Sequence, residues 1–289
     1  MHGLEIFVRS NSVATDGSGR GKPFKYGKFW QYHPRSDRHS KIACWGILFD
    51  LIISCPLLRS HIAAGKVGFG INHEMVDFAN NRKKTLDLVI CTYSGPKKVK
   101  GFSSFREMAD PFTIVLTEYE RNLLNSLPPL LTTNVSSVLV ALEAKACMTE
   151  FGKARPRLFD ELNSSHLTIH GAADNAIAAG LAIINGAERF ISPLVNNWPD
   201  DGRPIQWNFH NQPKDAKDTI AKVMQLPRRS KIGIDGFDAL SIVVIRCQND
   251  GSPITLEADP PAPQPGEIFH YASFIDRLSH LYATRFAAL

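Results

Sequence analysis

The sequence lacks any long apolar run. Its most apolar window, 43–58, is interrupted by Asp50 and Pro56 and is too short to span a bilayer. A secretion signal is also missing at the N-terminus, because residues 1–10 carry a charge on each side of a very short apolar core. We therefore expect a cytoplasmic protein that has no membrane partner.

Cysteine is scarce, and its arrangement argues against a disulfide framework. The chain has five cysteines, an odd number, and they are widely spaced and lie mostly inside apolar runs. These are Cys44, Cys55, Cys91, Cys147 and Cys247. We expect buried free thiols in a reducing compartment.

Several common catalytic motifs are missing too. There is no G-x-S-x-G nucleophile elbow and no H-E-x-x-H zinc helix. The segment 17–22 resembles a phosphate-binding loop, but Asp16 and Pro23 stand where that motif needs a glycine and a hydroxyl residue. His166 and His170 would share a helix face, yet no third ligand follows at a useful spacing, so we interpret them as structural histidines.

Size and charge indicate a sizeable globular protein with an acidic partner. With 289 residues and 44% hydrophobic content, 1–289 is expected to form one elaborated domain. The formal charge is +5, and the basic residues gather in short clusters, which suits phosphate groups along a nucleic-acid groove. Ordinary solvated loops are the alternative for any single cluster. The clusters are 22–28, 35–41, 82–84, 97–100, 153–157 and 228–231.

Hydrophobic periodicity predicts alternating helices and strands behind an extended basic segment over the first 40 residues. Pro56 is expected to break or restart the first helix, and a Pro-rich linker, 259–266, precedes the last one. The predicted helices are 42–64, 118–127, 157–179 and 267–286, and the predicted strands are 86–91, 135–146, 181–192 and 240–247.

The strand 138–145 carries the most unusual chemistry. Side chains alternate along a strand, so Glu143 and Lys145 emerge on the same face at the end of an otherwise apolar segment. Two charges there are costly unless they share a task. Glu143 would hold a divalent cation, and Lys145 would orient or deprotonate a water or neutralise a phosphate. A solvent-exposed ion pair at a strand end is the alternative interpretation.

A second acid supports the interpretation as a metal site. Asp87 stands at the head of another short apolar strand, behind the polar, basic segment 80–84. Two strands of one sheet can bring their acidic ends together. Mg²⁺ takes oxygen ligands, usually one or two carboxylates plus waters and substrate phosphate oxygens. Asp87 and Glu143 would supply that set.

An acid on one strand, E-x-K at the end of another and then a long helix resemble the PD-(D/E)xK nuclease superfamily, which includes many type II restriction endonucleases. The resemblance implies an α/β fold: a restriction-endonuclease-like core with a mixed central β-sheet flanked by helices, with insertions. It covers about 45–195, with a basic N-terminal extension (1–41), an insertion (94–134) and a C-terminal region (196–289) for recognition or dimerisation. Leu86 stands where the motif often has proline, and the stretch from Asp87 to Glu143 is much longer than a hairpin.

By this resemblance Asp87, Glu143 and Lys145 are the catalytic residues. Asp87, Glu143 and the backbone carbonyl of Ala144 would bind Mg²⁺, for which Mn²⁺ can substitute, and Glu74 on an upstream helix is a candidate extra acid. The residues that would grip the phosphates of double-stranded DNA are Lys153, Arg155 and Arg157.

The function implied is that of a metal-dependent endodeoxyribonuclease, a sequence-specific type II restriction enzyme acting as a homodimer. Two alternatives stay open. One is a repair, phage or mobile-element nuclease of the same superfamily. The other is a non-catalytic DNA-binding protein in which Glu143 and Lys145 are only a surface pair. The aromatic residues among nearby Asn and Gln residues would serve either base recognition or packing: Trp198, Trp207, Phe209 and His210.

Overall fold

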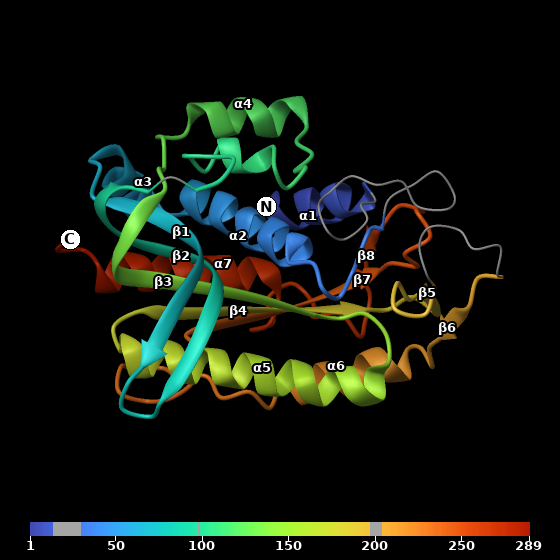
Figure 1. Ribbon diagram of the computed structural model, residues 1–289. Helices are drawn as coiled ribbons and strands as arrows, with labels where there is room; N and C mark the ends of the chain where they lie inside the picture. The colour runs from blue at the N-terminus through green and yellow to red at the C-terminus, as the bar shows by residue number, and fades with distance from the viewer. Residues whose placement is uncertain (14–29, 98, 197–203) are drawn as a thin grey trace.

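A mixed sheet of six strands forms the centre of the computed structural model, which describes residues 1–13, 30–97, 99–196 and 204–289 (Figure 1). The strand order is β1-β2-β3-β4-β7-β8: β1, β2 and β3 pair antiparallel, β3, β4 and β7 pair parallel, and β8 is antiparallel to β7. The strands are β1 Val67–Asp77, β2 Arg82–Pro96, β3 Thr133–Cys147, β4 Ile177–Asn185, β7 Ala239–Arg246 and β8 Thr255–Leu256. A separate hairpin pairs β5 (Arg189–Ile191) with β6 (Trp207–Phe209).

Helices cover both faces of this sheet, so the expected α/β class with a mixed, helix-flanked sheet is confirmed (Figure 1). Residues of α1, α2 and α7 share one apolar core with the sheet, and residues of α5 and α6 share the other. The helices are α1 Gly3–Ser12, α2 Arg38–Ser54, α3 Pro56–Ala63, the 3₁₀ turn η1 Glu107–Ala109, α4 Glu118–Ser126, α5 Phe151–Ala172, α6 Lys214–Val223 and α7 Tyr271–Arg285.

The central strands are apolar on both faces because each face lies under helices. All nine residues of β4 are buried, as expected for a parallel strand inside a sheet with two covered faces. The five cysteines are buried and free, which confirms the prediction made from their spacing.

Pro56 breaks the first predicted helix and restarts it, as expected. α2 ends at Ser54, and Pro56 occupies the first turn of α3, where its missing N–H has no intrahelical partner to lose. In the described part of the chain no single helix is long and apolar enough to cross a membrane, and α2 and α3 reach that length only together, across a 96° bend.

Several predicted elements differ from the structure. Residues 3–12 form α1 rather than part of an extended segment, while the basic cluster 22–28 and Trp198 lie outside the described residues. The segment 71–77, expected on a helix, belongs to β1, and Asp87 lies inside β2 rather than at the head of a strand. The predicted helix 157–179 is α5, which begins at Phe151 and ends at Ala172, and the predicted strand 181–192 divides into β4 and β5.

The predicted insertion and the predicted C-terminal region both contribute to the fold. The insertion 94–134 contains η1 and α4 and places apolar residues such as Phe105 and Leu124 against the α2 side of the sheet. The C-terminal region 196–289 supplies β7 beside β4, and α7, which packs on the same face as α2.

A buried ionic network ties the C-terminal helix to the sheet. Arg229 Nε lies 2.9 Å from Asp238 Oδ1, and both side chains are fully buried. Arg285 of α7 also pairs with Asp238, and the backbone N–H of Ala178 donates to Asp238 Oδ2 at 2.8 Å. Arg229 therefore belongs to the interior, although the basic cluster 228–231 looked suited to binding phosphate.

Candidate active site

A cleft of about 540 Å³ opens beside the carboxyl end of β3. Its walls come from the N-terminal turns of α2 and α5 and from the residues that follow β5. Asp87, Ala144 and Lys145 line it, together with Lys153 and Arg157 of α5. Segments far apart in the sequence thus meet at one edge of the sheet, where ligands of open α/β sheets generally bind.

Asp87 and Glu143 lie together where β2 and β3 separate. The paired register of these strands includes Leu88 opposite Leu142 and extends no further toward Asp87. Beyond that point side chains replace the ladder: the Ala144 N–H donates to Asp87 Oδ2 at 3.1 Å, and the Asp87 N–H donates to Glu143 Oε2 at 3.3 Å. The two acids that the sequence singled out are therefore adjacent and almost fully buried.

Lys41 and Ser40 of α2 hold the other oxygen of Asp87. The Lys41 ammonium lies 2.6 Å from Asp87 Oδ1, and the Ser40 hydroxyl donates to the same atom at 2.7 Å. The Lys41 side chain is only 1% exposed, so this ion pair is shielded from solvent. Oδ1 is thereby fully engaged, whereas Oδ2 accepts only the Ala144 N–H among the described residues.

Lys145 lies against Glu143 on the α5 side of the sheet. Its ammonium is 2.8 Å from Glu143 Oε1 and 3.8 Å from Glu161 Oε2, and Glu161 in turn pairs with Arg157 at 2.6 Å. Apart from the ion pair to Lys145, the buried Oε1 atom of Glu143 has no hydrogen-bond partner among the described residues. An incompletely satisfied carboxylate oxygen of this kind is a natural ligand for a cation.

The pKa values of the two acids move in opposite directions. Burial raises the pKa of Asp87, but the Lys41 and Lys145 ammonium groups outweigh it, and the pKa lies below its ordinary value. Burial and the neighbouring Asp87 charge raise the pKa of Glu143. A carboxylate that binds protons more readily than usual also gains most from a nearby cation.

Lys145 is an ammonium ion at neutral pH. Burial by itself lowers its pKa, but the carboxylates of Glu143 and Asp87 raise it to about 12. In this environment the side chain can orient a water or neutralise charge on a phosphate, whereas accepting a proton is disfavoured.

The basic residues that follow β3 are placed differently from one another. Lys153 and Arg157 line the cleft. Arg155 points toward α6, where it lies 3.7 Å from Asp218 and 3.9 Å from Asp215. Glu74 is on β1, not on a helix, and its carboxylate pairs with Lys83 at 2.7 Å, away from the cleft-lining residues.

Sequence reasoning gave no role beside the two acids to Ser40, Lys41 and Glu161. It counted Lys41 in the basic cluster 35–41 as suited to phosphate, whereas the side chain is buried against Asp87. A signal for Lys41 did exist, since it directly precedes the apolar run 42–49, all of which is buried. A lysine at the start of such a run needs a buried anionic partner. The pairing with Asp87 joins elements 46 residues apart, and a single sequence does not specify it.

Asp87, Ala144 and Lys145 thus line one edge of the cleft, where Lys41 pairs with Asp87 and Glu143 pairs with Lys145. Glu143 and Lys41 themselves are buried and are not among the residues that line the cleft. Within the described ranges no group of three or more His, Cys, Asp or Glu side chains is arranged to hold a metal ion. Asp87 Oδ2 and Glu143 Oε1 nevertheless keep acceptor capacity, and Mg²⁺ needs only one or two carboxylates when water and substrate supply the rest. Comparison with protein-family models, with curated proteins and with solved structures finds no match to this chain.

Proposed function

We propose that this protein is a metal-dependent endodeoxyribonuclease of the restriction-endonuclease-like type, cutting double-stranded DNA at specific sequences. The observation that carries the proposal is the contact between Asp87 and Glu143, with Lys145 2.8 Å from the second acid. The chain order supports it: a helix, two antiparallel strands, the strand bearing Glu143, a long helix and a parallel strand follow one another. This is the order that the resemblance implies.

A Mg²⁺ ion would be held by Asp87, Glu143 and the carbonyl of Ala144. When bound, it would supply charge stabilisation at the reacting phosphate and activation of the attacking water. Lys41 and Ser40 engage Oδ1 of Asp87 and so leave Oδ2 directed to the gap between β2 and β3. They are positioning residues for the carboxylate.

The remaining residues of the cleft suit a phosphodiester backbone. The Lys145 ammonium would neutralise charge that develops on the phosphate, held in place by Glu143 and by the more distant Glu161. Lys153 and Arg157 stand further along the cleft wall, both well exposed, where they would contact neighbouring phosphates.

The test is incubation of the purified protein with unmethylated plasmid DNA in Mg²⁺ and in EDTA. Discrete fragments that require Mg²⁺ are expected for a sequence-specific endonuclease. A smear, or cutting only at junctions and ends, would instead indicate a repair, phage or mobile-element nuclease of the same superfamily. Intact DNA in both conditions would overturn the catalytic proposal.

One observation favours the non-catalytic alternative. Each acid of the site already has an ammonium partner, Lys41 for Asp87 and Lys145 for Glu143, so these four side chains are neutral in sum without any metal. A DNA-binding protein with a structural ion-pair cluster would show this balance. Such a protein binds DNA equally well in Mg²⁺ and in EDTA and binds no Mn²⁺ at this site, which calorimetry measures directly.

Lys41→Met is expected to shift the pH dependence of Mn²⁺ binding. Burial alone raises the pKa of Asp87, and the loss of the Lys41 charge removes the main influence that lowers it. Protons would then compete with the metal up to a higher pH, and affinity on the acidic side of the titration should fall on the order of tenfold. Isothermal titration calorimetry over a pH series measures the effect.

The matched control is Lys153→Met, since this ammonium lies 3.8 Å from Glu150 and no ion pair joins it to Asp87 or Glu143. It should leave the pH dependence of Mn²⁺ binding unchanged. If both variants behave alike, Lys41 does not set the affinity of Asp87 for the metal.

A further inference from the structure

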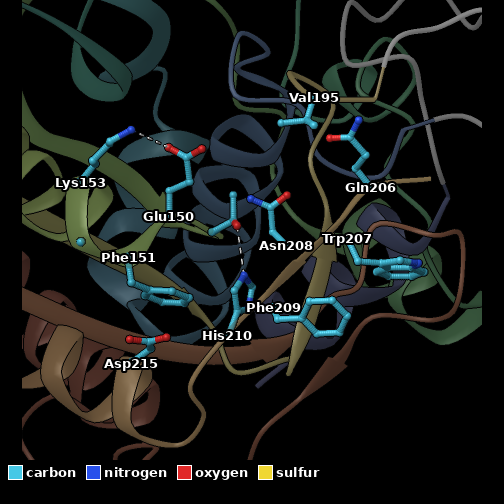
Figure 2. Close-up of a pocket in the computed structure, with 12 residues that line it drawn as sticks. Glu150, Phe151, Lys153, Val195, Gln206, Trp207, Asn208, Phe209, His210 and Asp215 are labelled. Carbon is cyan, nitrogen blue, oxygen red and sulfur yellow. Dashed lines mark hydrogen bonds and ion pairs between the residues drawn. The ribbon is translucent and has the colours of Figure 1, made fainter. Parts of the chain in front are cut away.

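A second hollow, of about 600 Å³, adjoins the cleft at the first turn of α5 (Figure 2). Thr149, Glu150 and Lys153 line both spaces, so they form the wall between them. The opposite side of the hollow is β6 with its flanking residues 206 and 210. A strand of nucleic acid lying in the cleft would therefore pass the mouth of this hollow.

Aromatic rings occupy the β6 side. Phe209 is 79% exposed, an unusual position for a phenylalanine on the rim of a hollow. Trp207 is half-buried, and the guanidinium of Arg189 lies 4.2 Å from the centre of its ring. Exposed aromatic faces beside a basic groove are the usual means of holding unpaired bases by stacking.

Two side-chain amides have unused hydrogen-bonding capacity on the other face of β6, because side chains alternate along a strand. In Figure 2 the amides of Gln206 and Asn208 extend among the lining residues of the hollow, and neither has a hydrogen-bond partner in the described part of the chain. The backbone beside them is fixed, since Gln206 N–H donates to Asn196 Oδ1 at 2.8 Å. Amide groups offer both donors and acceptors, as the edges of nucleobases do.

The His210 ring in the hollow is held by two hydrogen bonds and is uncharged. His210 Nδ1 is 2.7 Å from the carbonyl of Ala187 and must donate to it, so Nε2 accepts from the Thr149 hydroxyl at 3.0 Å. Burial lowers the pKa of His210, which keeps the ring neutral. The bond to Thr149 connects the hollow directly to the wall of the cleft.

The acidic residues of the hollow are paired with basic ones. Glu150 lies 3.8 Å from Lys153, and Asp215 lies 3.9 Å from Arg155. Lys153 keeps an 88% exposed side chain on the wall shared with the cleft, where a phosphate of a strand entering the hollow would pass. These two acids and two basic residues sum to zero charge, so they would not repel a polyanion.

We propose that this hollow binds one unpaired base of a DNA strand whose backbone lies in the cleft, with the base stacking on the exposed ring of Phe209. The inference rests on the proposed function for the identity of the strand. The inference adds a base-binding subsite beyond the cleavage residues. It implies that the base of one nucleotide next to the cleft is unstacked from its neighbouring bases.

The experiment compares Phe209→Ala with Phe78→Ala, an equally exposed phenylalanine (88%) at the turn between β1 and β2. Binding of a fluorescein-labelled oligothymidine of about 12 nucleotides is measured by anisotropy in EDTA, so that no cleavage occurs. Phe209→Ala should weaken binding on the order of tenfold, the usual effect of losing one stacked base, whereas Phe78→Ala should leave it unchanged.

A strand of equal length that carries only abasic sugar phosphates separates base binding from phosphate binding. It should bind the wild type and Phe209→Ala equally. Equal effects of the two phenylalanine variants, equal losses on both strands, or no binding of oligothymidine by the wild type would each overturn the inference. Failure of the nuclease proposal appears separately, as intact plasmid in Mg²⁺ while base-dependent binding in EDTA persists.

Discussion

Glu143→Gln is expected to lower the rate of plasmid cleavage in Mg²⁺ on the order of 10²–10³-fold. The amide keeps the size of the side chain but removes the negative charge, and it places an N–H₂ group at one of the oxygens that we assign to the metal. The loss should appear in initial rates of supercoiled plasmid consumption and in weaker Mn²⁺ binding by calorimetry. An unchanged rate would show that Glu143 takes no part in cleavage.

Glu74→Gln is the matched control, because it changes the same chemical group on an exposed side chain that pairs with Lys83. Its cleavage rate should equal that of the wild type. Thermal unfolding provides a second readout: burial raises the pKa of Glu143, so its charge is held at a cost to folding. Glu143→Gln should therefore unfold at the same or a higher temperature while losing activity.

Arg229→Ala is expected to lower the free energy of unfolding by about 3–5 kcal/mol. The guanidinium pairs with Asp238 and Asp174 and also donates to the carbonyl of Ala176 at 3.0 Å. Its removal leaves buried acceptors without donors and weakens the link between α7 and the sheet. Urea unfolding followed by circular dichroism measures the change as a lower midpoint with a similar slope.

The control is Arg246→Ala, which removes an arginine that is 60% exposed and pairs with Glu257. A surface pair of this kind contributes under about 1 kcal/mol. A similar small change in both variants would mean that the Asp238 network does not secure the C-terminal helix.

Acid stability gives an independent check on the same network. Burial raises the pKa of Asp238, but hydrogen bonds from Arg285, Arg229 and the Ala178 N–H outweigh it and lower the pKa below its ordinary value. A carboxylate with a lowered pKa stabilises the fold above its unfolded pKa, and the contribution is lost as the pH falls through the folded value. Arg229→Ala should therefore show a weaker loss of stability in acid than the wild type.

Periodicity located the elements that are buried on both faces. β3 and β7 lie close to their predicted bounds because each contains a continuous buried run, 139–144 in β3 and 239–245 in β7, and α4 begins at its capping box of Thr117 and Glu120. The elements near the cleft were less predictable. The second half of β1 and the start of β2 are polar and partly exposed, so a strand there depends on pairing with its neighbour rather than on local pattern.

The candidate site was likewise predictable where local pattern decides and unpredictable where tertiary pairing decides. Glu143 and Lys145 could be placed on one face because they are two positions apart on a strand, and their contact in the structure agrees with that geometry. Asp87 was singled out correctly as a neighbour of Glu143, although it lies in mid-strand. The lysine that balances Asp87 comes from another layer of the fold, and the pairing of layers is a tertiary property.

Because carboxylates replace the strand ladder at this point, the hydrogen exchange of two backbone amides reports on the state of the two acids. The N–H groups of Asp87 and Ala144 donate to side-chain oxygens of Glu143 and Asp87, not to carbonyls of the sheet. Their hydrogen exchange depends on whether those carboxylates are ionised and occupied, in contrast to the exchange of the regular ladder at Leu88 and Leu142. Any cation or proton that reaches the acids would thus alter how firmly the β1–β2 hairpin is fastened to the rest of the sheet.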